Sequence, residues 1–130
     1  MLFEFETNIY DVKPSKLNEI DEGFEKGNMF PELYDSYKNY KPKRIDAHNE
    51  REALLLKIMM LDFAMNDLNL YLAIHPRDVD TFEKFKQIAR HLKHCKEEYE
   101  QKYQVLDLCD DLGESYSWNS SPWPWEGENV

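Results

Sequence analysis

The side chains best suited to chemistry in this sequence are two imidazoles and a thiol, at His91, His94 and Cys95. On a helix, His91 and Cys95 would share a face because they are four residues apart. Imidazole and thiolate groups bind Zn²⁺, but a protein site needs three or four ligands and supporting hydrogen bonds. Neither an HExxH nor an ExxH motif accompanies these residues. We therefore expect no metal site and interpret Cys95 as a small core residue.

His75 also invites a catalytic interpretation. It precedes Pro76 with no second histidine or carboxylate pair beside it, so general acid–base catalysis lacks a partner group. Asp62 and Asp67 are five residues apart and would leave a helix in different directions. The sequence offers neither a nucleophile–base pair nor a phosphate-binding loop. We predict that the chain is not an enzyme. We interpret His75, Pro76 and Asp78 as structural turn residues, with the His75 side chain closing the turn by a hydrogen bond.

Helical periodicity supplies the framework for these residues. One apolar seam advances by four and three residues, the spacing of a single helix face. Its members are Leu54, Ile58, Leu61, Met65, Leu68 and Leu72. A second apolar stripe runs beside it, formed by Leu56, Met60, Phe63, Leu70 and Ile74. The pattern predicts a helix over about 46–74 with Asp46 as its N-cap. It should end near His75, because Pro76 disfavours the α conformation in the residue before it.

A second helix is predicted over about 79–104, where Asp78 and Asp80 suit a helix N-terminus. Its expected seam is Phe82, Phe85, Ala89 and Leu92, with Ile88, Cys95, Tyr99 and Tyr103 alongside. We therefore predict an all-α fold, a long antiparallel two-helix hairpin with extended aromatic arms. A hairpin covers only one seam of each helix. The second stripe must be covered by the arms, by a second copy in a four-helix bundle, or by another protein.

The N-terminal arm, residues 1–42, is aromatic and too short to form a core of its own. Gly23 and Gly27 are expected to break any helix, and Pro31 to begin a single turn over 31–34. Residues 1–20 are expected to be extended. The aromatic side chains must pack on the hairpin or on another chain, and both remain open. The candidate partner-binding residues here are Gly27, Phe30, Pro31, Leu33, Tyr34 and Tyr37.

The C-terminal tail, residues 107–130, follows the central hairpin region of residues 43–106. The tail is acidic, and it holds all 3 tryptophans of the chain. Proline alternates with tryptophan near its end, which favours polyproline II. Tryptophan is a common interface anchor, so the tail either folds back on the hairpin or docks on another subunit. The candidate partner-binding residues here are Trp118, Pro122, Trp123, Pro124 and Trp125.

Composition narrows the classes of partner. With 26 acidic and 16 basic residues, the formal net charge is −10. Nucleic acids and anionic membranes are therefore poor partners, since binding phosphates requires a basic surface. The two cysteines, Cys95 and Cys109, fit reduced thiols in an intracellular protein better than a disulfide framework. We expect no secretory signal and no membrane-spanning segment.

A series of motifs, taken in order, resembles the CotJB family of bacterial spore coat proteins. The motifs are LDF at 61–63, LNLYL at 68–72, HPRD at 75–78, Phe85, EYEQKY at 98–103, Trp118, and SPWPW at 121–125. Separately, EKGNMFPELY at 25–34, followed by Tyr37, resembles the C-terminal part of the companion coat protein CotJA. Ser36 stands where the CotJA pattern has a proline, and the proline-rich front of CotJA is absent.

The resemblance implies a sporulation protein made in the mother-cell cytoplasm and laid into the spore coat. A third member of that group, CotJC, is similar to manganese catalases. The implied function is therefore a non-enzymatic structural or assembly partner of such an enzyme, with the manganese in the partner and no cofactor in this chain. Two other hypotheses remain: a regulatory or chaperone-like helical binding module, and a small metalloprotein that uses His91, His94 and Cys95.

Overall fold

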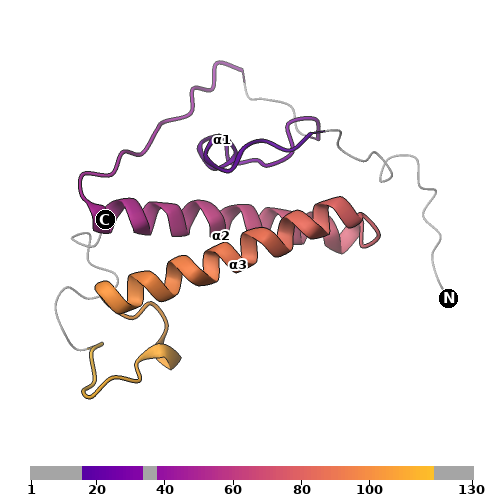
Figure 1. The fold of residues 1–130 in the computed structure, drawn as a ribbon. Helices are drawn as coiled ribbons and strands as arrows, with labels where there is room; N and C mark the ends of the chain where they lie inside the picture. Colours follow the sequence, from indigo (N-terminus) through magenta and orange to yellow (C-terminus); the bar gives the residue numbers. More distant parts are fainter. Residues whose placement is uncertain (1–15, 34–37, 119–130) are drawn as a thin grey trace.

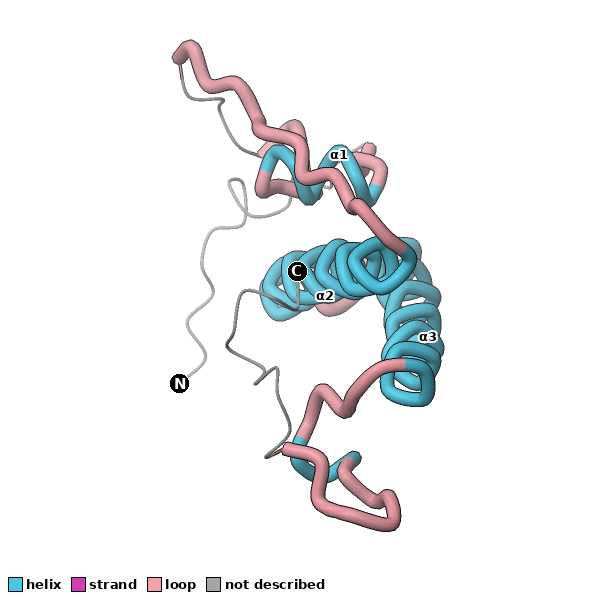
Figure 2. The backbone as a smooth tube through the Cα atoms, turned by 90° about the vertical axis from the view of Figure 1, so that its left-hand side faces the viewer, coloured by secondary structure: helices cyan, strands magenta, loops and turns pink. Residues whose placement is uncertain are grey.

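The computed structural model describes residues 16–33 and 38–118. This part of the chain contains three α-helices and a short 3-10 turn, namely α1 (Ile20–Lys26), α2 (Glu50–Ile74), α3 (Val79–Lys102) and η1 (Leu108–Asp110). α2 and α3 form an antiparallel hairpin, and α1 packs on a different side of α2 (Figures 1 and 2). The described residues contain no strand, so the predicted all-α class is confirmed for them.

The first long helix begins at Glu50 rather than at 46, so Asp46 was the wrong N-cap. The side chain of Asn49 caps the helix by accepting a hydrogen bond from the amide of Glu52 at 2.8 Å. The Glu52 carboxylate accepts in turn from the amide of His48 at 2.7 Å. These reciprocal bonds satisfy amides that the first helical turn leaves without partners. Asp46 lies outside the helix, exposed, and pairs with Arg44 at 3.3 Å.

The core lies where α2 meets α3, and on α2 it follows the predicted seam. The fully buried seam members are Ile58, Leu61 and Leu68, against which Leu54, Met65 and Leu72 pack. Pro76 and Asp78 set the turn between the helices as expected, since α2 stops at Ile74 and Asp78 is the N-cap of α3.

The face that α3 presents to α2 keeps Leu92 of the predicted seam and otherwise follows the residues predicted beside that seam. Its buried residues are Thr81, Ile88, Leu92, Cys95 and Tyr99. This set advances by seven, four, three and four residues, which defines one narrow face. Phe82, expected on the seam, is 46% exposed, and Phe85 and Ala89 are half-buried at its edge. The helix ends at Lys102 rather than at 104.

The N-terminal arm contains regular structure that the two glycines led us to exclude. Gly23 lies inside α1. A larger residue would collide there, because a Cβ at position 23 would lie 2.4 Å from the Sδ of Met29. Gly27 ends the helix with φ 72°, a left-handed C-cap for which glycine is favoured. The turn predicted to begin at Pro31 is present over residues 31–33, where the amide of Leu33 donates to the carbonyl of Phe30 at 3.1 Å, and Tyr34 lies outside the described residues.

After α3 the chain continues through η1 into a loop beside the end of the hairpin opposite the turn (Figure 1). Within the described ranges, no helix has both the length and the apolar character needed to cross a bilayer. The extended conformation predicted for residues 1–20 falls mostly outside the described residues. Within them, residues 16–19 have no helix, and α1 begins at Ile20.

Candidate association surfaces

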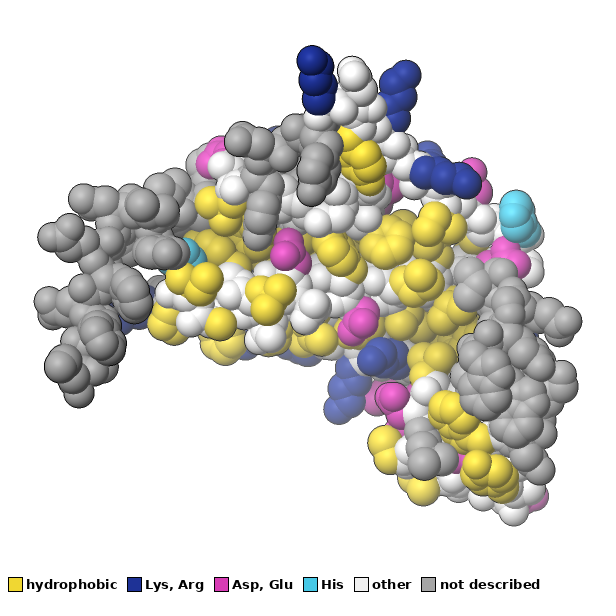
Figure 3. Space-filling model, turned by 180° about the vertical axis from the view of Figure 1, so that it is seen from behind, with side chains coloured by type: hydrophobic (Ala, Val, Ile, Leu, Met, Phe, Trp, Pro, Cys, Tyr) yellow, Lys and Arg dark blue, Asp and Glu magenta, His cyan; other side chains and the backbone are white. Residues whose placement is uncertain are grey.

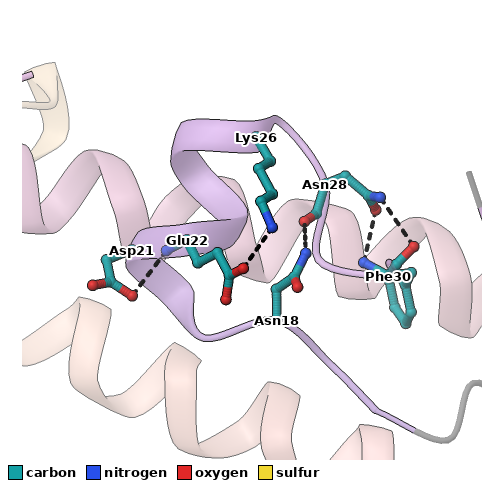
Figure 4. Close-up of polar contacts among 6 residues, drawn as sticks. All are labelled: Asn18, Asp21, Glu22, Lys26, Asn28 and Phe30. Atoms are coloured by element: carbon teal, nitrogen blue, oxygen red, sulfur yellow. Dashed lines mark hydrogen bonds and ion pairs between the residues drawn. The ribbon is translucent and has the colours of Figure 1, made fainter. Parts of the chain in front are cut away.

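Residues 17–33, which we name the clip, hold their shape through hydrogen bonds of their own. The side chain of Asn18 donates a hydrogen bond to the carbonyl of Asn28 at 2.7 Å, and the backbone amide of Asn18 donates to the carbonyl of Met29 at 2.9 Å. Asn28 in turn bonds the backbone of Phe30, donating at 3.0 Å and accepting at 2.7 Å (Figure 4). The loop after α1 is therefore fixed from both sides.

The contacts between the clip and α2 include a hydrogen bond and two aromatic pairs. The amide of Met29 donates to Oδ2 of Asp67 at 2.9 Å. Phe30 stacks on Tyr71, with ring centroids 4.6 Å apart, and the ring of Phe24 meets that of Phe63 edge-on at 6.0 Å. Met29 and Phe30 are 0% and 1% exposed, so they belong to the core of this chain.

The turn predicted from the sequence contains a half-buried carboxylate, that of Asp78. Asp78 accepts hydrogen bonds from the hydroxyl of Tyr71 at 2.8 Å, and from the hydroxyl and amide of Thr81 at 2.9 and 3.2 Å. Burial, the hydrogen bond to Asp78 and the charge of Asp78 raise the pKa of Tyr71 to about 12. The backbone of His75 closes the turn by donating to the carbonyl of Tyr71 at 2.9 Å, while its ring lies 4.5 Å from that of Tyr71. We predicted instead a hydrogen bond from the His75 side chain.

The predicted partner-binding residues have different surroundings. Phe30 is buried on this chain's own hairpin, which was the alternative left open for the arm. Gly27, Pro31 and Leu33 are exposed, and Trp118 is half-buried. The remaining candidates, Tyr34, Tyr37, Pro122, Trp123, Pro124 and Trp125, lie outside the described residues.

Four large apolar side chains flank the turn of the hairpin and remain exposed. They are Leu70, Ile74, Val79 and Phe82, with exposed fractions of 60%, 60%, 67% and 46%, and we name them the turn-end group. The second stripe predicted for the first helix contained Leu70 and Ile74, and the clip does not bury them. Hydrophobic side chains also spread over the hairpin surface seen from behind (Figure 3).

At the end of the hairpin opposite the turn, Arg51 of α2 contacts residues at the end of α3. Its guanidinium donates to the hydroxyl of Tyr99 at 3.2 Å and to the side chain of Gln104 at 3.1 Å, and lies 5.8 Å from the centre of the Tyr103 ring. The start of α2 is thereby held against the end of α3.

The residues suggested as metal ligands do not share one environment. Cys95 is 2% exposed and contributes to the core, and its burial raises the pKa of the thiol. His91 and His94 lie exposed on α3. The structure instead brings together three carboxylates that sequence reasoning missed, Glu100, Asp107 and Asp110, whose oxygens lie within 4.8 Å of one another. Burial is the main cause of the raised pKa of Glu100, and nearby Asp110 adds to it.

The loop after η1 is organised by Asp111. Its carboxylate accepts from the amide and hydroxyl of Ser117 at 3.0 and 2.7 Å, and these bonds lower the pKa of Asp111. The next residue, Trp118, buries its Nε1 without an acceptor in the described part of the chain. A buried donor left without a partner costs free energy, so Trp118 is a position where an acceptor would stabilise the protein.

Comparison with known families gives a match to this chain. The family described as CotJB protein matches residues 52–126, which include all of α3 and nearly all of α2. Comparisons with curated proteins and with solved structures give no match. The matched residues make up more than half of the chain, and they contain the turn and both buried seams. The chain therefore belongs to the CotJB family and is a spore coat-related protein.

Proposed function

We propose that this chain is a non-enzymatic structural or assembly protein of the spore coat, made in the mother cell, that acts through protein–protein association. The turn-end group carries the proposal, because four large apolar side chains, in the parts of α2 and α3 nearest the turn, remain 46–67% exposed. Clustered exposed apolar side chains on a small domain mark interaction sites. Membership in a coat family supports the same conclusion.

The polar groups around the core support a structural role. Asp67 anchors the clip, Asp78 caps α3 and holds Tyr71, and Asn49 caps α2. Each of these side chains satisfies backbone or hydroxyl donors of the fold. A carboxylate engaged in this way stabilises a scaffold, which is the property that an assembly protein requires.

The partner that we propose is a manganese-catalase-like coat protein of the CotJC type. In this scheme the metal belongs to the partner. This assignment of the metal to the partner is supported by the surroundings of the candidate ligands, since His91 and His94 are exposed and Cys95 is buried. An apolar contact between the turn-end group and helices of the partner would bury surface that this chain leaves exposed.

We also propose that the tail helps to anchor the chain, through Trp118 and the Trp-Pro run of residues 122–125. The buried Nε1 of Trp118 supports this idea, since an acceptor on a partner would satisfy it. Removing residues 118–130 should weaken incorporation into the coat. If the trimmed chain is incorporated as well as the full chain, the tail is not an anchor.

Incorporation during sporulation tests the proposal. The Leu70→Glu/Ile74→Glu variant places charges on the turn-end group, and Asn66→Glu/Asn69→Glu places the same charges at other exposed positions of α2. The chain is measured in purified coat and in the mother-cell lysate. We expect the first variant to remain in the lysate and the second to reach the coat like the wild type. Equal incorporation of both variants would exclude the turn-end group as the contact.

A further inference from the structure

The clip (residues 17–33) meets the hairpin as a preformed ligand would. Its internal hydrogen bonds, from Asn18 to Asn28 and Met29 and between Asn28 and Phe30, involve no atom of α2. The clip then presents two adjacent side chains, Met29 and Phe30, that are almost completely buried. A segment that is ordered before contact loses less entropy when it binds.

The surface that receives the clip is a single stripe of α2. Phe63, Asp67 and Tyr71 are spaced by four residues, so they lie on one helix face. The two rings make aromatic contacts at either end, and the carboxylate between them accepts the amide of Met29 at 2.9 Å. A polar group placed among apolar side chains fixes the orientation of what binds there.

The family match includes the stripe on α2 and leaves out the clip that covers it. The match begins at residue 52, so it includes Phe63, Asp67 and Tyr71 and excludes every residue of the clip. Residues 38–48, between the clip and α2, are exposed throughout. Residues 52–126 alone, without the clip, would therefore present the stripe uncovered.

We infer that the stripe formed by Phe63, Asp67 and Tyr71 is a peptide-docking surface. Its occupant is a segment of a separate protein with the pattern of the clip: a short helix, a left-handed glycine, an asparagine, and an apolar–aromatic pair. In this chain the linker holds such a segment in cis, where a short tether gives an effective concentration on the order of millimolar. This surface is distinct from the turn-end group, and the inference does not depend on the proposed coat partner.

Cleavage of the tether tests the inference on the full chain. A site-specific protease sequence is inserted between Pro42 and Lys43, which are both exposed. After cleavage, we expect the two parts to co-elute at micromolar concentration. A labelled synthetic peptide of residues 16–33 should then displace the cleaved clip, with the helical circular dichroism of the hairpin retained. Because the hairpin stays wild type, variant peptides can be compared without affecting its folding.

The peptide variants provide the matched comparison. Phe30→Ala should weaken competition roughly a hundredfold, because the ring is fully buried, while Leu33→Ala, at a position 38% exposed, should change it by less than about threefold. Separation of the parts after cleavage, or equal competition by both variants, would overturn the inference. An uncut dimer that becomes monomeric on cleavage would assign the stripe to a second copy instead.

Discussion

The amide of Met29 donates a hydrogen bond to the carboxylate of Asp67 at 2.9 Å, which joins the N-terminal arm to the middle of the first long helix. Since Met29 is fully buried, its amide has no water to replace this acceptor. This polar contact helps to fix the register in which the clip packs on α2.

Replacing Asp67 by alanine should destabilise the protein by about 1–3 kcal/mol, because a buried amide loses its acceptor. Asp62→Ala is the control, since Asp62 is exposed on the same helix and should change the free energy of unfolding by no more than about 0.5 kcal/mol. Urea denaturation measures both. Equal midpoints for the two variants would show that the contact contributes nothing to stability.

Stability should fall at alkaline pH because of Tyr71. Its hydroxyl has a pKa of about 12 in the folded chain against 10.0 for an ordinary tyrosine. The stabilisation that comes from this pKa difference is fully present below pH 10, where Tyr71 is protonated in both the folded and the unfolded chain. It is lost as the pH rises towards 12, because the unfolded chain then ionises first. This loss should reach about 2 kcal/mol.

Urea unfolding between pH 9 and about 12, compared with Tyr71→Phe, isolates this contribution from other titrating groups. The variant should lose less stability over that interval than the wild type. Parallel pH profiles would mean that the bond between Tyr71 and Asp78 does not shift this titration.

Gly23→Ala should destabilise the protein by about 1–3 kcal/mol, although alanine is the better helix former. The added methyl would lie 2.4 Å from the Met29 Sδ and 3.2 Å from the carbonyl oxygen of Asn28, and Met29 is buried and cannot move away freely. Gly113→Ala is the comparison, since the nearest atom to its Cβ would be the Ser115 carbonyl oxygen at 4.0 Å. Thermal unfolding that ranked Gly113→Ala as the more damaging change would contradict this packing.

The two thiols should react at very different rates. Cys95 is 2% exposed and its burial raises the pKa of the thiol, whereas Cys109 is exposed. Maleimide labelling at neutral pH should give one rapid modification, which Cys109→Ser removes, and a second modification only in denaturant. Rapid labelling of Cys95 in the native protein would mean that the seam opens readily.

Much of the hairpin could be predicted because local signals agreed. The seam through Leu61 and Leu68, the stop before Pro76 and the cap at Asp78 each depend on neighbours in the chain. The arm could not be predicted in this way. Gly23 was expected to break a helix, and its role becomes apparent only beside Met29, which the chain brings back through the turn at Gly27.

The candidate surfaces were predictable only in part, for a similar reason. The spacing identified a second stripe on the first helix, but only packing shows that the clip covers Phe63 and leaves Leu70 and Ile74 exposed. The contact of Asp67 could not be predicted, because its partner is a backbone amide, which carries no signal in the sequence. Phe82 is exposed because the seam of α3 lies on a neighbouring face.

Native mass spectrometry tests the central claim, that this chain acts by association and not by chemistry of its own. The chain is analysed alone and after co-expression with a manganese-catalase-like coat protein, with metal content measured in both samples. We predict a complex of fixed stoichiometry in which metal is present only when the partner is present, and which the Leu70→Glu/Ile74→Glu variant fails to form. Stoichiometric metal on the chain alone would contradict the account. A self-assembled oligomer that does not bind the partner would exclude the proposed partner and leave a self-assembling coat component.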